Sequence, residues 1–181
     1  MQYLIETPFL CSSMNFLLLI YINWQIFSPL NLLEDNFYTP NEKDIKASKR
    51  SFDELMIMAS LLEREEPKEK NRPLVAGIIW KRLDNNWNLG IDATSHYNLK
   101  DWNDRKGLLK ALRDPKDPYN TRLRSGLPPT PIGSPSTKSL EAALHPTDSP
   151  YWYYLHDSQQ NIHPAKSASG HEANRRKYNV Y

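Results

Sequence analysis

At residues 59–66 the chain reads Ala59-Ser60-Leu61-Leu62-Glu63-Arg64-Glu65-Glu66, and this stretch closes a longer apolar run. The run begins after Ser51-Phe52-Asp53-Glu54, which has the form of a capping box because a hydroxyl precedes a glutamate by three residues. Leu55, Met58 and Leu62 then recur at the i, i+3, i+7 spacing of one helical face. The pattern predicts a core helix with several carboxylates at its C-terminal end.

The apolar face points towards a carboxylate. Glu65 lies three residues past Leu62 and Glu66 lies four past it, whereas Glu63 is expected to point away. Burial raises the pKa of a carboxyl group and so prepares a general acid. Periodicity does not choose between Glu65 and Glu66, although Pro67 disfavours helix at the residue before it. The alternative interpretation is a solvated helix end with mixed charges, which is what such runs usually form.

Composition narrows the class of protein. The chain has 181 residues, enough for one domain with a sizeable core, and its net charge of +2 does not call for a nucleic-acid partner. Cys11 is the single cysteine, so an intrachain disulfide is excluded. The five histidines do not cluster at short metal-ligand spacings. We therefore expect neither a metal nor a cofactor.

Residues 1–50 differ in character from residues 51–181, and we predict two parts with these bounds. No Lys or Arg precedes Lys43, so a signal peptide is not indicated. The apolar run at residues 17–22 is shorter than the roughly 20 residues that a spanning helix needs. We interpret this part as a poorly ordered or surface-packed lead segment. The alternatives are a partly buried helix, a membrane-surface contact or the misread start of a longer gene.

The remaining chain predicts an α+β fold, with helices packed against a small antiparallel sheet and long Pro-rich loops. Pro73 suits the first turn of a helix. The aromatic run at residues 151–156 has the composition of a strand. The other expected elements are a short segment at 89–94, a rigid loop at 126–133, and helices over 74–83, from Ser136 or Thr137 to Ala143, and from a capping box at Ser169 to Tyr178.

Several short motifs, taken in order, resemble the catalytic part of the YceG-like endolytic murein transglycosylases, the MltG type. Residues 59–65 are similar to the family signature Ala-Ser-Ile-Val-Glu-Lys-Glu. The further matches are Val75-Ala76-Gly77 through Lys81-Arg82-Leu83, Leu89 to Thr94, Tyr119-Asn120-Thr121, Gly126-Leu127-Pro128-Pro129 with Pro131-Ile132, Ser139-Leu140 with Ala142-Ala143 and Pro146, and Tyr153 to Asp157 with His163 and His171. Each motif is weak alone, but their order across two-thirds of the chain is specific.

The sequence also departs from the family pattern. Gly90 stands where the family has Gln, and Ala93 where it has Pro. We do not recognise the family's upstream Glu-Gly-x-x-Phe-Pro-Asp-Thr-Tyr segment in residues 1–50, nor a LysM-like module or a membrane anchor. The chain is therefore interpreted as a shortened member of the family or a gene fragment.

The resemblance implies a role for particular residues. In the family the second glutamate of the signature is catalytic, which selects Glu65 here. It implies cleavage of peptidoglycan between N-acetylmuramic acid and N-acetylglucosamine, leaving a 1,6-anhydro end. Asp92 is expected to bind sugar groups, and the alternative is that it only caps a turn. Asn120 is expected to position sugar groups, and the alternative is that it only makes a hydrogen bond within its loop. The other residues expected to bind substrate are Thr94, Tyr119 and Thr121, and the residues able to stack on sugars, unless they are core, are Trp80, Trp87, Trp102 and Trp152.

The resemblance further implies a place and partners. Such an enzyme acts on nascent glycan strands in cell wall assembly and strand-length control, at the outer face of the bacterial cytoplasmic membrane. Glycan strands are the implied partner, and peptidoglycan synthases are candidates. Two alternatives stay open. One is a water-using muramidase with Glu65 as acid and Asp92 as base, and the other is a non-catalytic peptidoglycan-binding fragment.

Overall fold

The computed structural model describes residues 31–180, so the expectations for the first part of the lead segment, residues 1–30, lie outside the described residues. The chain divides into two compact units, residues 1–42 and residues 43–181. The division falls eight residues earlier than the predicted boundary at residue 50, so residues 43–50 belong to the second unit. That unit contains every residue that the sequence singled out for chemistry.

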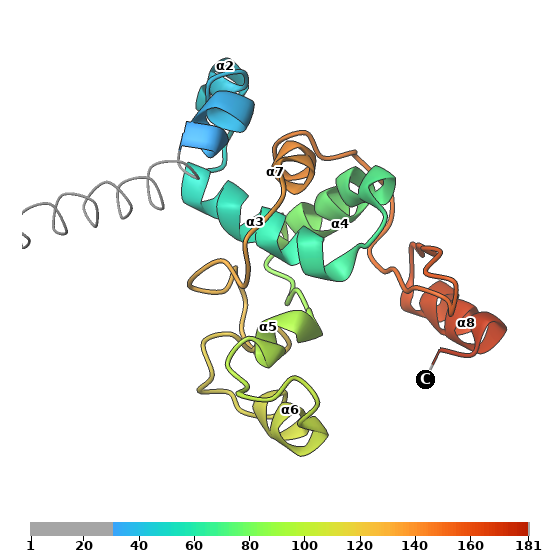
Figure 1. Cartoon of the computed structure of the whole chain (residues 1–181). Coiled ribbons are helices and arrows are strands. Elements are labelled where there is room, and N and C mark those ends of the chain that lie inside the picture. The colour runs from blue at the N-terminus through green and yellow to red at the C-terminus, as the bar shows by residue number, and fades with distance from the viewer. Residues whose placement is uncertain (1–30, 181) are drawn as a thin grey trace, which may run out of the picture. The chain divides into compact units, whose positions relative to one another are not determined.

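The described chain is built from helices joined by long loops (Figure 1). A π-helix, η1 (Glu34–Tyr38), lies in the first unit, and α2 (Glu42–Ala47) spans the boundary. The remaining elements are α3 (Phe52–Glu65), a 3-10 helix η2 (Glu69–Asn71), α4 (Arg72–Asp84), α5 (Asp92–His96), α6 (Arg105–Ala111), α7 (Thr137–Leu144) and α8 (Ala168–Tyr178).

Helix α3 forms as the sequence predicts. The Ser51 hydroxyl accepts from the Glu54 amide at 3.2 Å, and the Glu54 carboxylate accepts from the Ser51 amide at 2.8 Å. Leu55, Met58 and Leu62 are fully buried, so the predicted stripe is the core face. The helix ends at Glu65, because the backbone of the following residue is extended. The capping box and the apolar period thus fix both the start and the buried face of α3.

Helices α3, α4 and α7 pack against one another to form the core of the second unit (Figure 1). The Trp80 indole crosses from α4 to α7 and donates to the Ala143 carbonyl at 3.0 Å. Burial of a Val, Leu or Ile side chain contributes about 1.5–3 kcal/mol, and those buried on α4 and α7 are Val75, Ile78, Ile79 and Leu140. Ala76, Ala142 and Ala143 are buried in the same core.

Gly77 and Ser60, which lie in the family motifs, have packing roles in the structure. A Cβ on Gly77 would lie 1.9 Å from the Thr147 carbonyl oxygen, so only glycine lets the chain after α7 cross α4 there. Ser60 is fully buried on α3, where its hydroxyl accepts from the Ile132 amide at 3.0 Å. That bond docks the Pro-rich loop on the core helix. These contacts account for Gly77 and Ser60 without any role in chemistry.

The predicted sheet is wrong, because the described residues contain no strand. The aromatic run at 151–156 does turn back on residues 162–165, but it forms only two isolated antiparallel bridges, Tyr153 with Ala165 and His156 with Ile162. Pro164 has no amide to extend the pairing, and Leu155 bonds the His163 carbonyl at a long 3.3 Å. A two-stranded ribbon without a third strand is marginal. The fold is therefore helical rather than α+β.

Other bounds differ in detail from the prediction. Helix α8 is capped by Ser167, whose hydroxyl accepts from the Gly170 amide, rather than by Ser169. Helices α5 and α6 were not predicted, since one has five residues and the other lies in a charged stretch without a clear period. Within residues 31–180, no helix combines the length and the apolar character needed to cross a membrane.

A shortened chain tests the expectation that residues 1–50 are dispensable to the core. A chain beginning near Ala47 keeps Arg50, whose guanidinium bonds Asp84 and lies 4.2 Å from the Trp80 ring centroid. It loses the exposed 3.5 Å contact of His145 with Asp44, and such contacts are worth about 0–1 kcal/mol. We expect the shortened chain to keep the far-UV circular dichroism and the cooperative melting of the full chain. A broad, non-cooperative transition would contradict this.

Candidate active site

The end of α3 carries three glutamates, and each has different partners. Glu63 faces the start of α7, where its Oε2 accepts from the Ser136 hydroxyl at 2.7 Å and the Ser139 hydroxyl at 2.8 Å. The guanidinium of Arg72, itself buried, bonds both Glu63 oxygens at 3.1 and 3.2 Å. Burial alone would raise the pKa of Glu63, but these hydrogen bonds and the Arg72 charge lower it. Glu63 is thus an ionised link between α3, α4 and α7.

Glu66 is a second structural carboxylate. Its residue is fully buried, and its backbone is extended, with φ −127° and ψ 103°, as expected before Pro67. Its Oε2 lies 2.9 Å from His156 Nε2, and its Oε1 accepts from the Lys68 amide at 2.8 Å. Both oxygens are therefore occupied, and Glu66 ties the end of α3 to the 151–165 hairpin.

Glu65 differs from both. The Tyr154 hydroxyl donates to Glu65 Oε2 at 3.1 Å, and within residues 31–180 no hydrogen bond reaches Oε1. Burial raises the pKa of Glu65, the nearby charge of Asp92 adds to the increase, and the Tyr154 bond with the charges of His156 and Arg82 only partly oppose it. Glu65 thus combines an oxygen that has no hydrogen-bond partner within the described residues with a carboxyl group whose pKa is raised.

Tyr154 stays protonated beside this carboxyl group. Burial raises the pKa of Tyr154 well above its ordinary value, and the charge of Glu65 raises it further. Its hydroxyl therefore acts as a donor to Glu65 Oε2, while Oε1 has no hydrogen-bond partner within residues 31–180. Arg82 lies 5.7 Å from the Tyr154 ring centroid and bonds the Leu89 and Trp152 carbonyls at 2.6 to 2.8 Å. Arg82 thereby joins the two segments that border Glu65.

Asp92 is held by Arg122. The guanidinium donates to the two Asp92 carboxylate oxygens at 2.5 and 2.7 Å, and both side chains are partly exposed. This bidentate pair brings the 119–124 loop against the start of α5, within electrostatic range of Glu65. The structure therefore brings Asp92 to the candidate site, already carrying a partner.

The predicted binding residues Thr94, Asn120 and Thr121 are buried, with exposed fractions of 0–2%. The two threonine hydroxyls lie 3.3 Å apart, and each donates to the Ile91 carbonyl, at 2.7 and 3.1 Å. The Asn120 amide group donates to the carbonyls of Ala111 and Asp114, and its oxygen accepts from two amides of the following turn. The geometry supports a role in holding the Asp92 and Arg122 loops.

Tyr119 lies closer to the surface. Its hydroxyl is 2.8 Å from the Thr130 hydroxyl, and its ring lies 5.1 Å from that of Tyr97, which is 47% exposed. Of the tryptophans, Trp80 is core, while Trp87 and Trp102 are 40% and 56% exposed. The Trp102 ring stacks on His96 and lies 5.6 Å from the guanidinium of Arg64, the residue before Glu65.

The sequence did not identify Tyr154, Arg82, Arg122 or the Glu66–His156 pair as site residues. Arg82 lay in a quoted motif as the arginine after Lys81, and Tyr154 lay in the aromatic run. Their partners are 70 to 90 residues away along the chain, and Arg122 is 30 residues from Asp92. The signal for Arg82, Tyr154 and His156 was that these residues lie inside family motifs, whereas Glu66 and Arg122 lie one residue beyond such motifs.

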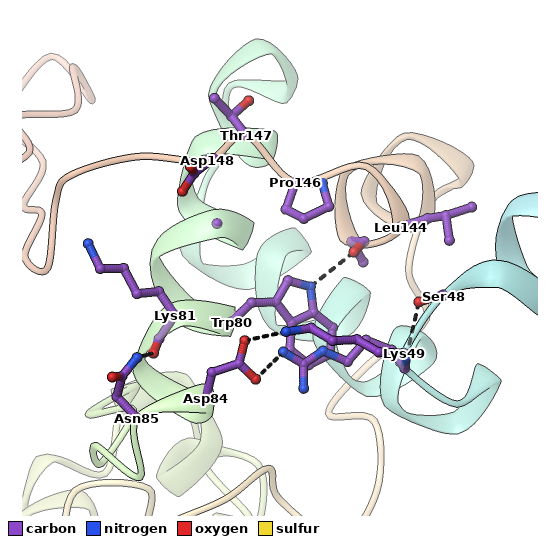
Figure 2. Close-up of a pocket in the computed structure, with 13 residues that line it drawn as sticks. Ser48, Lys49, Trp80, Lys81, Asp84, Asn85, Leu144, Pro146, Thr147 and Asp148 are labelled. Atoms are coloured by element: carbon purple, nitrogen blue, oxygen red, sulfur yellow. Dashed lines mark hydrogen bonds and ion pairs between the residues drawn. The ribbon is translucent and has the colours of Figure 1, made fainter.

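A pocket of about 430 Å³ lies between α4, α7 and residues 48–50 (Figure 2). Three of its charged residues pair with one another, because Asp84 accepts from Lys49 at 2.8 Å and from Arg50 at 2.5 Å. Trp80 points into this region and is bonded to α7 (Figure 2). Glu65 and its partners do not line this pocket. It is therefore separate from the candidate active site.

The raised pKa of Glu65 predicts a pH-dependent effect of Glu65→Gln on stability. A raised folded-state pKa stabilises the protein fully below the unfolded value of 4.5, and this contribution is lost as the pH rises through the folded value. The Gln variant, which cannot ionise, should therefore become progressively more stable than the wild type as the pH rises above 4.5. Urea unfolding from pH 4 to pH 9 measures this. Parallel stability curves, or a difference of opposite sign, would show that the pKa is not raised.

The Glu63 network predicts a purely structural effect. Glu63→Ala leaves the buried Arg72 guanidinium and the Ser136 and Ser139 hydroxyls without their shared acceptor. Leaving a buried charged donor unpaired should cost about 2–3 kcal/mol of unfolding free energy. Chemical denaturation measures the loss, and Glu141→Ala, which removes only an exposed pair with Lys138, is the matched control. Equal effects of the two variants would contradict the structural role.

Comparison with known proteins identifies the family to which the chain is similar. The model of the YceG-like family matches residues 28–177. The chain is 34% identical over 146 residues to the endolytic murein transglycosylase of Bacillus subtilis, covering 80% of this chain and 40% of that protein. It is 27% identical over 144 residues to the endolytic murein transglycosylase of Streptococcus pneumoniae, covering 77% and 26%. A crystal structure of a YceG-like protein from Listeria monocytogenes matches with a TM-score of 0.68 at 29% identity, covering 76% and 44%.

The chain thus spans less than half the length of each of these relatives. The family match begins at residue 28, inside the predicted lead segment, and it ends one residue before the end of α8. It includes every motif on which the resemblance rested, and the family expected from the sequence is confirmed. With a family model matching most of its length, this chain belongs to the YceG-like family.

Proposed function

We propose that the chain is an endolytic lytic transglycosylase that cleaves peptidoglycan glycan strands between N-acetylmuramic acid and N-acetylglucosamine. The observation that carries this proposal is the environment of Glu65, whose carboxyl group has a raised pKa, with one oxygen bonded by Tyr154 and the other without a partner among residues 31–180. The naming of two relatives as endolytic murein transglycosylases supports the substrate and the reaction. The substrate is a strand of the cell envelope, and no cofactor is needed for the chemistry.

The reaction uses one carboxyl group twice. Protonated Glu65 donates its proton from Oε1 to the glycosidic oxygen, and the bond from that oxygen to C1 of N-acetylmuramic acid breaks. The resulting Glu65 carboxylate accepts the proton of the C6 hydroxyl of the same sugar, whose oxygen bonds to C1. The products are a free N-acetylglucosamine hydroxyl and a 1,6-anhydro end, and Glu65 regains its proton. No water is consumed, unlike in glycoside hydrolysis.

Tyr154, Asp92 and Arg122 have supporting roles in this proposal. The Tyr154 hydroxyl fixes the orientation of the carboxyl group, and the Asp92 charge favours its protonated form. Arg122 holds Asp92 and tempers that charge. Thr94, Asn120 and Thr121 act behind them by holding the two loops in place. Tyr119 is the remaining predicted residue that is exposed enough to touch a sugar.

A water-using muramidase with Asp92 as base fits the geometry less well. A general base must accept a proton from water, but both Asp92 oxygens already accept from Arg122 at 2.5 and 2.7 Å. Analysis of the products separates the two reactions, since 1,6-anhydro ends mark transglycosylation and reducing ends mark hydrolysis. The second alternative is a non-catalytic peptidoglycan-binding fragment. Binding to purified sacculi without glycan release would support it.

Action on nascent strands, during wall assembly and with control of strand length, belongs to the same proposal. So does a location at the outer face of the cytoplasmic membrane. Peptidoglycan synthases are the candidate protein partners, because they produce the strand that Glu65 would cut. These assignments rest on the resemblance to the family rather than on a feature of the site.

The decisive experiment compares Glu65→Gln with Glu66→Gln. Glutamine at 65 can still accept from Tyr154 but cannot deliver a proton, so release of anhydro-muropeptides should fall about 10²–10⁴-fold. Mass spectrometry of products from uncrosslinked glycan strands measures this, at a temperature where both variants are folded. Glu66→Gln should lower the melting temperature, because the group is buried against His156, yet retain far more activity.

Two results would count against the assignment. If both variants keep the parent activity, neither glutamate is the acid. If Glu66→Gln is the more damaging to chemistry at equal folded fraction, the assignment belongs to Glu66. A folded parent that binds sacculi but releases no glycan would overturn the catalytic proposal in favour of the binding fragment.

A further inference from the structure

A polar pocket of about 810 Å³ adjoins the candidate active site and has no role in the proposed reaction. Two of its lining residues connect it to that site. Arg82 lies within electrostatic range of Glu65, and Arg122 holds Asp92. The rest of the wall comes from the end of α4 and the segment that follows, including Trp87. A ligand that extends beyond Glu65 in this direction would therefore enter the pocket.

Trp87 offers this pocket a fixed aromatic surface. Its ring is 40% exposed, stacks on Trp152 with centroids 5.0 Å apart, and meets Tyr153 edge-on at 5.6 Å. Tyr153 precedes Tyr154, which bonds Glu65. The 151–165 hairpin thus contacts both the Trp87 indole and the Glu65 carboxyl group. An indole held rigidly on one side and open on the other suits stacking on the apolar face of a flat ring.

Three asparagines, Asn85, Asn86 and Asn88, line the same pocket with their side-chain amide groups. Asn85 and Asn88 spend their amide donors on the Lys81 and Arg122 carbonyls, both at 2.8 Å. Within residues 31–180 their side-chain oxygens accept no hydrogen bond, and the Asn86 side chain makes none. The backbone at Gly90, which also lines the pocket, is open, since a Cβ there would have nothing within 4 Å. The pocket therefore presents unpaired amide groups beside an indole.

The two arginines that line the pocket already have hydrogen-bond partners. The Arg82 guanidinium is used by the Leu89 and Trp152 carbonyls, and that of Arg122 by the Asp92 carboxylate. All three Arg82 nitrogens and two Arg122 nitrogens thus already have partners, so these bonds hold both guanidinium groups in place. A ligand with apolar ring faces, hydroxyls and secondary amides matches what remains, and an N-acetylhexosamine has all three.

We propose that this pocket is a subsite for a β-1,4-linked N-acetylhexosamine ring of the strand, beyond the sugars cleaved at Glu65. Trp87 stacks on the ring, and the unpaired amides, Asn86 foremost, bond its acetamide group. This assignment rests on the proposed function for its direction from the catalytic residue, but the binding itself does not need cleavage. The subsite would favour cutting within a strand, because a strand held there must continue past the cleaved bond.

Nuclear magnetic resonance of the full chain carrying Glu65→Gln tests the subsite without turnover. The probe is chitotetraose, followed through the indole N–H signals, with Trp87 assigned by its loss in Trp87→Phe. Saturating chitotetraose should shift the Trp87 signal. The Trp80 indole, buried and bonded to Ala143, should not move and serves as the internal reference. Shifts at other tryptophans with none at Trp87 would overturn the proposal.

Affinity provides the second readout. Trp87→Ala removes the stacking surface and its buried area, so it should weaken chitotetraose binding about tenfold. Asn86 has a positive φ of 54°, so Asn86→Gly removes the amide while keeping the backbone, and it should weaken binding about threefold. Leu109→Ala, an exposed apolar truncation on α6 outside the pocket, should have no effect.

A comparison of ligands tests the amide part of the proposal. Cellotetraose has the same linkage but lacks acetamides, so it should bind about tenfold more weakly than chitotetraose. Equal affinities would overturn the role of the asparagines. The outcomes separate the two proposals, because an active parent with an unresponsive Trp87 rejects only the subsite. An inactive parent that binds chitotetraose through Trp87 rejects only the catalytic function.

Discussion

The candidate site depends on one constraint, which is that three neighbouring carboxyl groups at the end of α3 lie in three different environments. A helix turns about 100° per residue, so Glu63 and Glu65 point in different directions, and the extended backbone at Glu66 gives that residue a third. Glu63 meets donors that favour its charge, and Glu66 is buried against His156. Glu65 alone meets burial and a like charge with a single donor. The difference between structural and chemical carboxylates therefore arises from which element faces each direction.

The surrounding loops maintain that difference. Ser60 docks the Pro-rich loop on α3, and Gly77 allows the chain after α7 to cross α4 before reaching the hairpin that carries Tyr154. The buried Thr94 and Thr121 hydroxyls lock the segment before α5 to the loop that carries Arg122. Loops without regular hydrogen bonding can hold a precise site only if their polar groups are satisfied in this way. The long loops of this fold are therefore ordered parts of the site.

Features encoded locally could be predicted from the sequence. The start and buried face of α3, the helix after Pro73 and the helix capped by Ser136 follow from caps and apolar period. The hairpin at 151–165 was wrongly predicted as part of a sheet, because aromatic composition reports packing rather than the presence of a third strand. Glu65 was reached through the family resemblance and not through period, which left Glu66 equally placed. The guanidinium contacts of Arg72 and Arg122 join distant segments and leave no local pattern.

A single-carboxylate reaction places particular demands on such a site. The same group must hold a proton until substrate is bound and then take one back, so its pKa should lie near the working pH rather than at either extreme. Burial and Asp92 raise the pKa of Glu65, while Tyr154, His156 and Arg82 limit the increase. Removal of the opposing groups would leave an acid too weak to protonate the leaving oxygen. Removal of the burial would leave a carboxylate with no proton to give. In the proposed reaction, the balance between burial and Asp92 on one side and Tyr154, His156 and Arg82 on the other would let one glutamate serve as both acid and base.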